Sequence, residues 1–532
     1  MMHWSDHLIL LPIVLPLIVA AAMLLPSGEH RRIKSALSIA TTLALVGIAL
    51  TLTIFAMSGA PDGGDTAKVY ALGDWPAPFG IVMVVDRLSA MMLLLTSVLG
   101  FCTLLFALVR WDRAGPRFYS LFLLLLMGVN GAFLTGDLFN LFVFFEVMLA
   151  ASYGLVLHGS GEPRIRAGLH YIAINLLAST FFLIGVSLIY GVAGTLNMAD
   201  LAARIAEIPP ADRPLLEAGA AILGTAFLIK AGMWPLGFWL PNTYAAASAP
   251  AAAMFAIMSK VGGYAIVRLS LLVFGSQGGD SAGFGSSWLL VGGIATIGYG
   301  TVGILGTREL ARAAGYVLLI SSGTMIAVVG TGSTPALSGA LFYMVGSTFA
   351  AASLFLLAGI LERSRKGAAT AADPVFNDEY HDPFENHDIE EVGVVIPPAV
   401  ATLGVCFVIC SLLVAGVPPF AGFIGKFAIF NALLPPDEPA GMAAWAVIAA
   451  LTFSSLGLLI ALVRLGVSLL WIPGETGDLA AWPTELAALG ALLVCALALT
   501  LWGGAALHYV EQTSAWLNSP TGYIRAVLLG AP

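Results

Sequence analysis

The chain has 532 residues, of which 59% are hydrophobic and only 10% are charged, and its formal net charge is −8. Soluble domains carry about 25% charged residues, so the composition excludes a soluble globular protein. Nothing in the charge pattern indicates nucleic-acid binding, and the four cysteines all fall in apolar segments that indicate core packing, not a disulfide or a metal site.

Apolar segments long enough to cross a bilayer recur along the whole chain, which predicts helices and not a barrel of short alternating strands. We therefore predict an all-α integral membrane protein with about 14 transmembrane helices. The first segment has no basic leader and no cleavage site, so we expect a retained span. The predicted spans are 8–26, 36–57, 85–109, 118–136, 138–158, 168–191, 216–240, 243–271, 287–306, 313–330, 335–361, 394–433, 441–465 and 483–507.

Basic clusters set the predicted orientation. They lie at 30–34, 110–117, 164–166, 308–312 and 363–366, after predicted spans 1, 3, 5, 9 and 11. All five would lie on one side of the membrane, which is the cytoplasmic side by the positive-inside rule. We therefore expect a multi-pass protein with both termini outside.

Two segments between the spans differ from simple connections. Residues 198–213 predict an amphipathic helix at the outer interface. The predicted cytoplasmic loop 367–393 holds eight acidic residues between 367 and 391 and no lysine or arginine there. This loop is either a solvated segment that docks against a neighbour or a vestibule that attracts cations.

Four ionisable residues fall deep inside predicted spans: Glu146, Lys230, Lys260 and Lys426. A lysine at the centre of a bilayer costs roughly 2.5–3.5 kcal/mol, so such residues are normally functional and face a partner. Burial favours the neutral amine, whereas a nearby carboxylate favours the ammonium. A buried lysine beside a movable carboxylate can therefore take up and release a proton; purely structural ion pairs are the alternative.

These residues predict a proton path. Glu146 on span 5 and Lys230 on span 7 form the natural pair, and Lys260 and Lys426 would continue the path. Trp234 lies one turn after Lys230 and either faces its ammonium or is a core tryptophan.

Prolines predict breaks in two helices. Ala231-Gly232 precedes Pro235 and Ala415-Gly416 precedes Pro419, and proline removes a backbone donor and clashes with the preceding turn. Interrupted helices in corresponding positions of two halves indicate an inverted repeat. We predict helices 1–3 in 1–115, two inverted five-helix repeats with broken helices 7 and 12 in 116–271 and 287–465, and helix 14 with a C-terminal tail in 483–532.

Four motifs in this order resemble the antiporter-like subunits shared by respiratory complex I and Mrp-type cation/proton antiporters. They are GDLFNLFVFFEVMLAASYG around Glu146, FLIKAGMWPLGFWLPNTYAAASAP around Lys230, SKVGGYAIVRL around Lys260 and GVPPFAGFIGKF around Lys426. The resemblance covers about residues 80 to 430 and includes DRLSAMMLLL at Asp86. In its length near 530 residues, without the extra C-terminal domain of the large A subunit, the chain resembles the D subunit of an Mrp antiporter.

The resemblance implies roles and partners. Glu146 and Lys230 would be the charge pair that drives proton movement, Lys260 the central relay and Lys426 the terminal one. It implies no cofactor, protons and sodium as transported ions, the bacterial inner (plasma) membrane, and a hetero-oligomer with the other Mrp-type antiporter subunits (A, B, C, E, F and G).

The chain departs from the family pattern where histidines are common in the tenth and eleventh spans. Val317 and Gly346 occupy those regions, so the link between Lys260 and Lys426 lacks titratable residues. His170, near the start of span 6, either supplies protons from inside or is an interfacial histidine. The hydroxyl side chains that could hold water along the link are Ser321, Ser322, Thr324, Tyr343, Ser347 and Thr348.

The sequence therefore predicts a proton-translocating subunit of a multisubunit Na⁺/H⁺ antiporter, a secondary transporter and not an enzyme. The alternative is a proton-pumping membrane subunit of a complex I-like or hydrogenase-linked redox enzyme. The chain carries no iron–sulfur or haem ligand set, so it is not the redox part in either case. A scaffold that merely kept these charges is the third possibility. No intramembrane acid cluster has oxygen-ligand spacing, so we expect no sodium site wholly inside this chain.

Overall fold

The computed structural model describes residues 6–25, 30–58, 67–111, 115, 117–159, 161–371, 398–436, 439–470 and 482–529. Within these ranges, twelve helices are long and apolar enough to cross a membrane, and three apolar helices are shorter. The predicted acidic loop lies outside the described residues from 372 onward; residues 367–371 extend the preceding helix.

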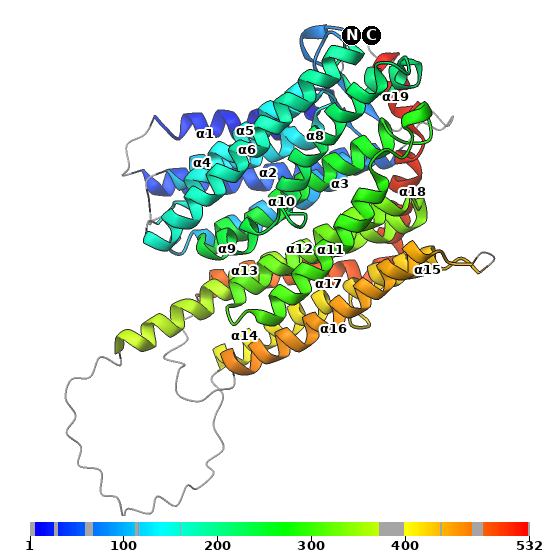
Figure 1. Cartoon of the computed structure of the whole chain (residues 1–532). Coiled ribbons are helices and arrows are strands. Elements are labelled where there is room, and N and C mark those ends of the chain that lie inside the picture. Colours follow the sequence, from blue (N-terminus) through cyan, green and yellow to red (C-terminus); the bar gives the residue numbers. More distant parts are fainter. Residues whose placement is uncertain are drawn as a thin grey trace, which may run out of the picture.

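The first half of the chain forms ten helices among the described residues, and the two halves of the bundle lie side by side (Figure 1). These helices are α1 (Leu11–Ala22), α2 (Arg31–Met57), α3 (Arg87–Ala107), α4 (Phe118–Leu134), α5 (Leu138–Val156), α6 (Glu162–Ala193), α7 (Met198–Arg204), α8 (Arg213–Ala231), α9 (Trp239–Ala246) and α10 (Ala249–Leu272).

The second half packs mainly on itself, and α10 meets it through contacts with α12 and α13. Its helices are α11 (Ser286–Gly306), α12 (Leu310–Thr331), α13 (Thr334–Ala371), α14 (Pro398–Ala415), α15 (Ala421–Leu433), α16 (Met442–Leu470), α17 (Pro483–Leu501), α18 (Gly503–Leu517) and α19 (Pro520–Leu528). Short 3₁₀ turns occupy Asp6–Ile9, Leu72–Asp74, Ile205–Glu207 and Gly279–Ser281.

The two helices that precede the predicted breaks end at glycines in the left-handed conformation. Gly232 after α8 has φ +78° and Gly416 after α14 has φ +75°. A side chain is costly at such angles, so glycine is the usual residue at this cap position. The chain resumes as the short helix α9 after the first break and as α15 after the second, so both helices are interrupted where the sequence predicts.

The helix boundaries differ from the prediction at three places. The predicted span 243–271 is divided, because residues up to Ala246 belong to α9 and α10 starts at Ala249, where Pro250 suits a first helical turn. The amphipathic segment 198–213 is shorter than predicted, since α7 ends at Arg204. The C-terminal tail, in turn, contains α18 and α19 beyond the last span.

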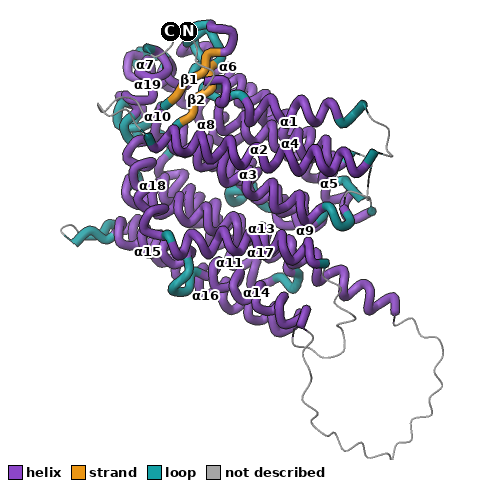
Figure 2. The backbone as a smooth tube through the Cα atoms, turned by 180° about the vertical axis from the view of Figure 1, so that it is seen from behind, coloured by secondary structure: helices purple, strands orange, loops and turns teal. Residues whose placement is uncertain are grey.

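The fold also contains a small sheet that the all-α prediction lacks. Strands β1 (Lys68–Ala71) and β2 (Val82–Val85) pair antiparallel, with Lys68 opposite Val85. All four β2 residues are buried, and such short strands leave too little alternation to detect in a sequence. The hairpin lies at the same end of the bundle as α7 and α19 (Figure 2).

The opposite end of the bundle carries the last residues of α1, the first residues of α2 and the end of α13 (Figure 1). Arg110, Arg164 and Arg363 line one cavity there. We call this the arginine end and use it below as a reference.

Candidate functional site

The four predicted ionisable residues lie on four different helices. Lys230 on α8, Lys260 on α10 and Lys426 on α15 are buried, with exposed fractions of 5%, 1% and 3%. Glu146 on α5 is partly buried. Because burying a charge without partners is expensive, the surroundings of each lysine decide what the group can do.

Glu146 and Lys230 do not form a closed ion pair. The Glu146 carboxylate accepts a hydrogen bond from Ser179 on α6. Lys230 Nζ has no hydrogen-bond partner among the described residues, and it lies 4.9 Å from the centroid of the Phe145 ring. A desolvated cation over an aromatic face gains about 2 kcal/mol. Lys230 also lies in the last turn of α8, where the helix dipole favours a cation.

The structure does not bring Trp234 or His170 to the lysines. Trp234 is 47% exposed, so it is not a core residue, and its backbone N–H donates to Thr296 Oγ1 at 2.9 Å. The ring under the Lys230 ammonium is that of Phe145, which comes from α5 and not from the break. His170 is exposed on α6.

Lys260 is surrounded by hydroxyl groups on α12. Its Nζ donates to Ser321 Oγ at 2.9 Å and to Ser322 Oγ at 3.3 Å, and it approaches the Leu318 carbonyl at 3.5 Å. Ser321 Oγ lies 2.7 Å from Ser347 Oγ on α13. Two consecutive hydroxyls, of Ser321 and Ser347, therefore join this lysine to α13.

Lys426 on α15 has partners on α13, α14 and α16. Its Nζ donates to Ser455 Oγ on α16 at 2.8 Å and to the Ala415 carbonyl at 3.2 Å. It also lies 5.2 Å from the centroid of the Tyr343 ring. Tyr343 is one turn before Ser347 on α13, and its buried hydroxyl has no partner among the described residues.

The other two predicted hydroxyls are used within their own helices. Thr324 donates to the Ile320 carbonyl at 2.8 Å and Thr348 to the Met344 carbonyl at 2.7 Å. Ser321 and Ser322, in contrast, bond to Lys260. Ser347 bonds to Ser321 and also to the Met344 carbonyl of its own helix at 3.1 Å.

A further buried ion pair escaped the sequence prediction. Arg268, two turns after Lys260 on α10, forms a two-pronged ion pair with Asp86, the residue that caps α3. Arg268 also donates to the Tyr264 hydroxyl at 3.1 Å. Both charged side chains are almost fully buried. The sequence signal was present in the motifs around Asp86 and Lys260, but both residues lie near predicted span ends, where charges commonly reach water.

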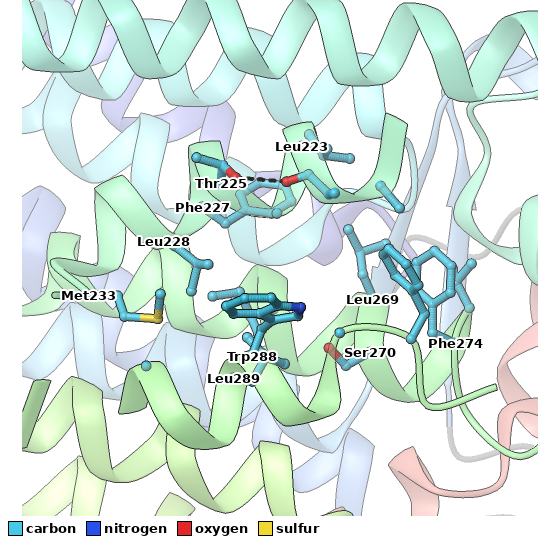
Figure 3. A pocket seen from close by; sticks show the side chains of 18 of the residues that line it. Leu223, Thr225, Phe227, Leu228, Met233, Leu269, Ser270, Phe274, Trp288 and Leu289 are labelled. Atoms are coloured by element: carbon cyan, nitrogen blue, oxygen red, sulfur yellow. Dashed lines mark hydrogen bonds between the residues drawn. The ribbon is translucent and has the colours of Figure 1, made fainter. Parts of the chain in front are cut away.

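A cavity beside the first break is apolar. It has a volume of about 520 Å³, and Figure 3 shows Leu223, Phe227, Leu228, Leu269, Phe274 and Trp288 around it. No charged residue lines it, and the Thr225 hydroxyl is bonded to the Ala221 carbonyl at 2.8 Å. Such a lining cannot replace the hydration shell of an ion, so this cavity is not an ion site. Among the described residues, no group of three or more His, Cys, Asp or Glu is placed to hold a metal.

Comparisons with known proteins identify the family of this chain. The family model described as NADH:quinone oxidoreductase/Mrp antiporter, TM, matches residues 135–457, a range that includes Glu146 and the three buried lysines. A relative from Rhizobium meliloti, named as the probable D subunit of a K(+)/H(+) antiporter, is 49% identical, covering 99% of this chain and 98% of the relative. The D subunit of the Na(+)/H(+) antiporter of Alkalihalophilus pseudofirmus is 36% identical over 80% of each chain.

Solved structures show the same fold. A chain in the structure of the Mrp complex from Dietzia sp. DQ12-45-1b matches with a TM-score of 0.83 and 26% identity, covering 99% of this chain and 100% of that one. A chain of the membrane-bound sulfane sulfur reductase, an archaeal respiratory membrane complex, matches with a TM-score of 0.82 at 23% identity, covering 98% and 99%. This chain therefore belongs to the NADH:quinone oxidoreductase/Mrp antiporter membrane family, and its relatives include D subunits of cation/proton antiporters.

Proposed function

We propose that this chain is the proton-translocating D subunit of a multisubunit cation/proton antiporter, a secondary transporter of the bacterial inner membrane. The observation that carries the proposal is the set of three buried lysines, each in a different polar environment. Groups that hold a proton at membrane depth and differ in their partners are what a proton path needs. The relatives named as antiporter subunits support this function.

The proposed roles follow the positions of the groups. Glu146 and Lys230 form the charge pair, and its open state here supports a pair that can close and separate. Lys260 is the central relay and Lys426 the terminal one. Between them, Ser321 and Ser347 supply a bridge in place of the histidines common in the family.

The proposed architecture keeps the predicted divisions of the chain. Adding α1 and α4 to the twelve long apolar helices, with α9 and α15 completing α8 and α14, gives fourteen spans. The glycine breaks at Gly232 and Gly416 support two inverted repeats, 116–271 and 287–465, between the first three helices and the last one. The arginine end then faces the cytoplasm, both termini lie outside, and the A, B, C, E, F and G subunits complete the complex.

The transported cation is the first property to test. The relatives differ in their named ion, potassium for the one at 49% identity and sodium for the one at 36%. Everted vesicles from antiporter-deficient cells that express the complete complex should lose a preformed ΔpH when either potassium chloride or sodium chloride is added. Vesicles without the complex are the control. If neither cation collapses ΔpH in vesicles with assembled complex, the antiporter proposal fails and the redox-driven pump becomes the better reading.

A second prediction tests the hydroxyl bridge. Ser321→Ala removes a hydrogen bond to the Lys260 ammonium, and a bond to a charged group contributes about 1.5–3 kcal/mol. We expect the initial rate of ΔpH collapse to fall roughly 10- to 100-fold, and Ser347→Ala to act in the same direction. Thr324→Val on the same helix is the matched control, because that hydroxyl bonds only within α12. Equal rates in Ser321→Ala and Thr324→Val would remove the bridge from the path.

A further inference from the structure

A group of buried polar atoms lies between Glu146 and the arginine end without hydrogen-bond partners among the described residues. The atoms are Tyr153 Oη on α5, Trp239 Nε1 and Tyr244 Oη on α9, and Ser248 Oγ at the start of α10. An unsatisfied buried donor or acceptor costs about 1–3 kcal/mol, and native proteins satisfy almost all such groups with protein or ordered water. Several in one region point to bound water.

The side chains form one cluster around Tyr171 of α6. Its ring lies 5.4 Å from the Tyr153 ring and 5.3 Å from the Trp239 ring, measured between centroids. The Trp239 and Tyr244 rings are 5.9 Å apart. The Tyr171 hydroxyl is paired with Ser152 Oγ at 2.8 Å. Aromatic side chains with polar groups, from the three helices α5, α6 and α9, therefore pack in one cluster.

One end of this cluster reaches Glu146. Tyr153 follows Glu146 by seven residues on α5, so the two side chains lie on one face of the helix, two turns apart.

The other end opens into a polar cavity of about 110 Å³ at the arginine end, which Tyr244 lines together with Arg110 and Arg164. That volume holds several water molecules. Arg164 also donates to the Ala246 carbonyl at 2.9 Å, which fixes the end of α9 beside the cavity.

We propose that Tyr153, Tyr171, Trp239 and Tyr244 hold a chain of ordered waters that carries protons between this cavity and Glu146. Each hydroxyl or water accepts one proton from the neighbour on one side and releases its own proton to the neighbour on the other side. No group in the chain therefore changes its net charge after a full passage. Trp239 can only donate, so it orients a water without relaying a proton. The inference rests on the proposed function. It also gives the role predicted for exposed His170 to Tyr171, the buried residue that follows it on α6.

Activity of hydroxyl-deletion variants is the first part of the test. Tyr153→Phe and Tyr244→Phe keep the rings but remove the hydroxyls. We expect the initial rate of ΔpH collapse to fall about tenfold in each, with the cation concentration for half-maximal rate unchanged. Tyr316→Phe on α12, whose ring packs on Tyr299, is the matched control and should keep the wild-type rate. Wild-type rates in both test variants, in vesicles where wild type is active, would overturn the route and leave the antiporter proposal standing.

The second part of the test detects bound water directly. It requires no transport activity and no substituted protein. X-ray-generated hydroxyl radicals label side chains that contact water, and mass spectrometry locates the label in the intact complex. Tyr153, Trp239 and Tyr244 should be labelled several-fold faster than Tyr264, which is buried but donates to the Phe133 carbonyl at 2.7 Å. Labelling no faster than that of Tyr264 would show a dry cluster and overturn the inference, even if the wild-type complex performs no antiport.

Discussion

Replacing Lys230 by alanine is expected to abolish cation-driven collapse of ΔpH while the complex still assembles. The Lys230 ammonium makes no hydrogen bond to the described residues, so its removal leaves no buried polar atom unpaired. Glu146 keeps its bond from Ser179. What is lost is the cation over Phe145 and, with it, the amine next to the break of α8. The measurement is the initial rate in everted vesicles, with assembly followed on native gels.

Two companion variants make this result specific. Glu146→Gln keeps the shape of the side chain and should cause the same loss, because an amide cannot take up the proton of the proposed pair. Lys68→Ala removes a lysine on β1, whose Nζ lies over Phe55, and should leave transport at the wild-type rate. Full activity in an assembled Lys230→Ala complex would place the proton path outside this pair.

Asp86→Asn is expected to have the largest effect on stability. The substitution leaves the Arg268 charge buried without its carboxylate, and breaking a buried pair in this way costs about 3–5 kcal/mol. It also weakens the cap of α3, where Asp86 accepts from the Ser89 backbone N–H at 2.9 Å. We expect a lower thermal midpoint for loss of the purified complex and less complex in the membrane.

The physical cause can be separated from general damage. If the cost arises from the orphaned charge, Asp86→Asn combined with Arg268→Gln should recover much of the lost stability. Glu309→Gln breaks an exposed pair with Arg312 and should change stability by less than about 1 kcal/mol. A wild-type midpoint for Asp86→Asn alone would mean that Arg268 finds another partner.

The positions of the spans and of the intramembrane charges could be predicted because both depend on composition along the chain. A lysine within an apolar run is visible without knowing its neighbours, so Glu146, Lys230, Lys260 and Lys426 were identifiable from the sequence. Arg268 was missed because a charge near a span end can pair in the interior or reach water, and only packing decides which.

Side-chain direction could not be predicted for the same reason. Trp234 follows Lys230 by one turn, but α8 ends before it and the chain turns away, so the ammonium meets Phe145 of another helix. The eight-residue helix α9 was divided between the predicted spans 216–240 and 243–271, because it is too short for its own periodicity to appear. The pairing of the Ser321 and Ser347 hydroxyls could not be predicted either, because it depends on how α12 packs against α13.

The bond between Lys426 and the final carbonyl of α14 limits how this half of the protein can switch. A cation at a helix C-terminus is worth about 0.3–1 kcal/mol, and about 2 in partly buried geometry. Inverting a two-state population from 1:99 to 99:1 needs about 5.5 kcal/mol. Loss of one proton from Lys426 therefore biases the end of α14 without inverting its population. In the proposed antiport cycle, a full reversal of this helix end would therefore need a second charge that arrives or leaves in the same step.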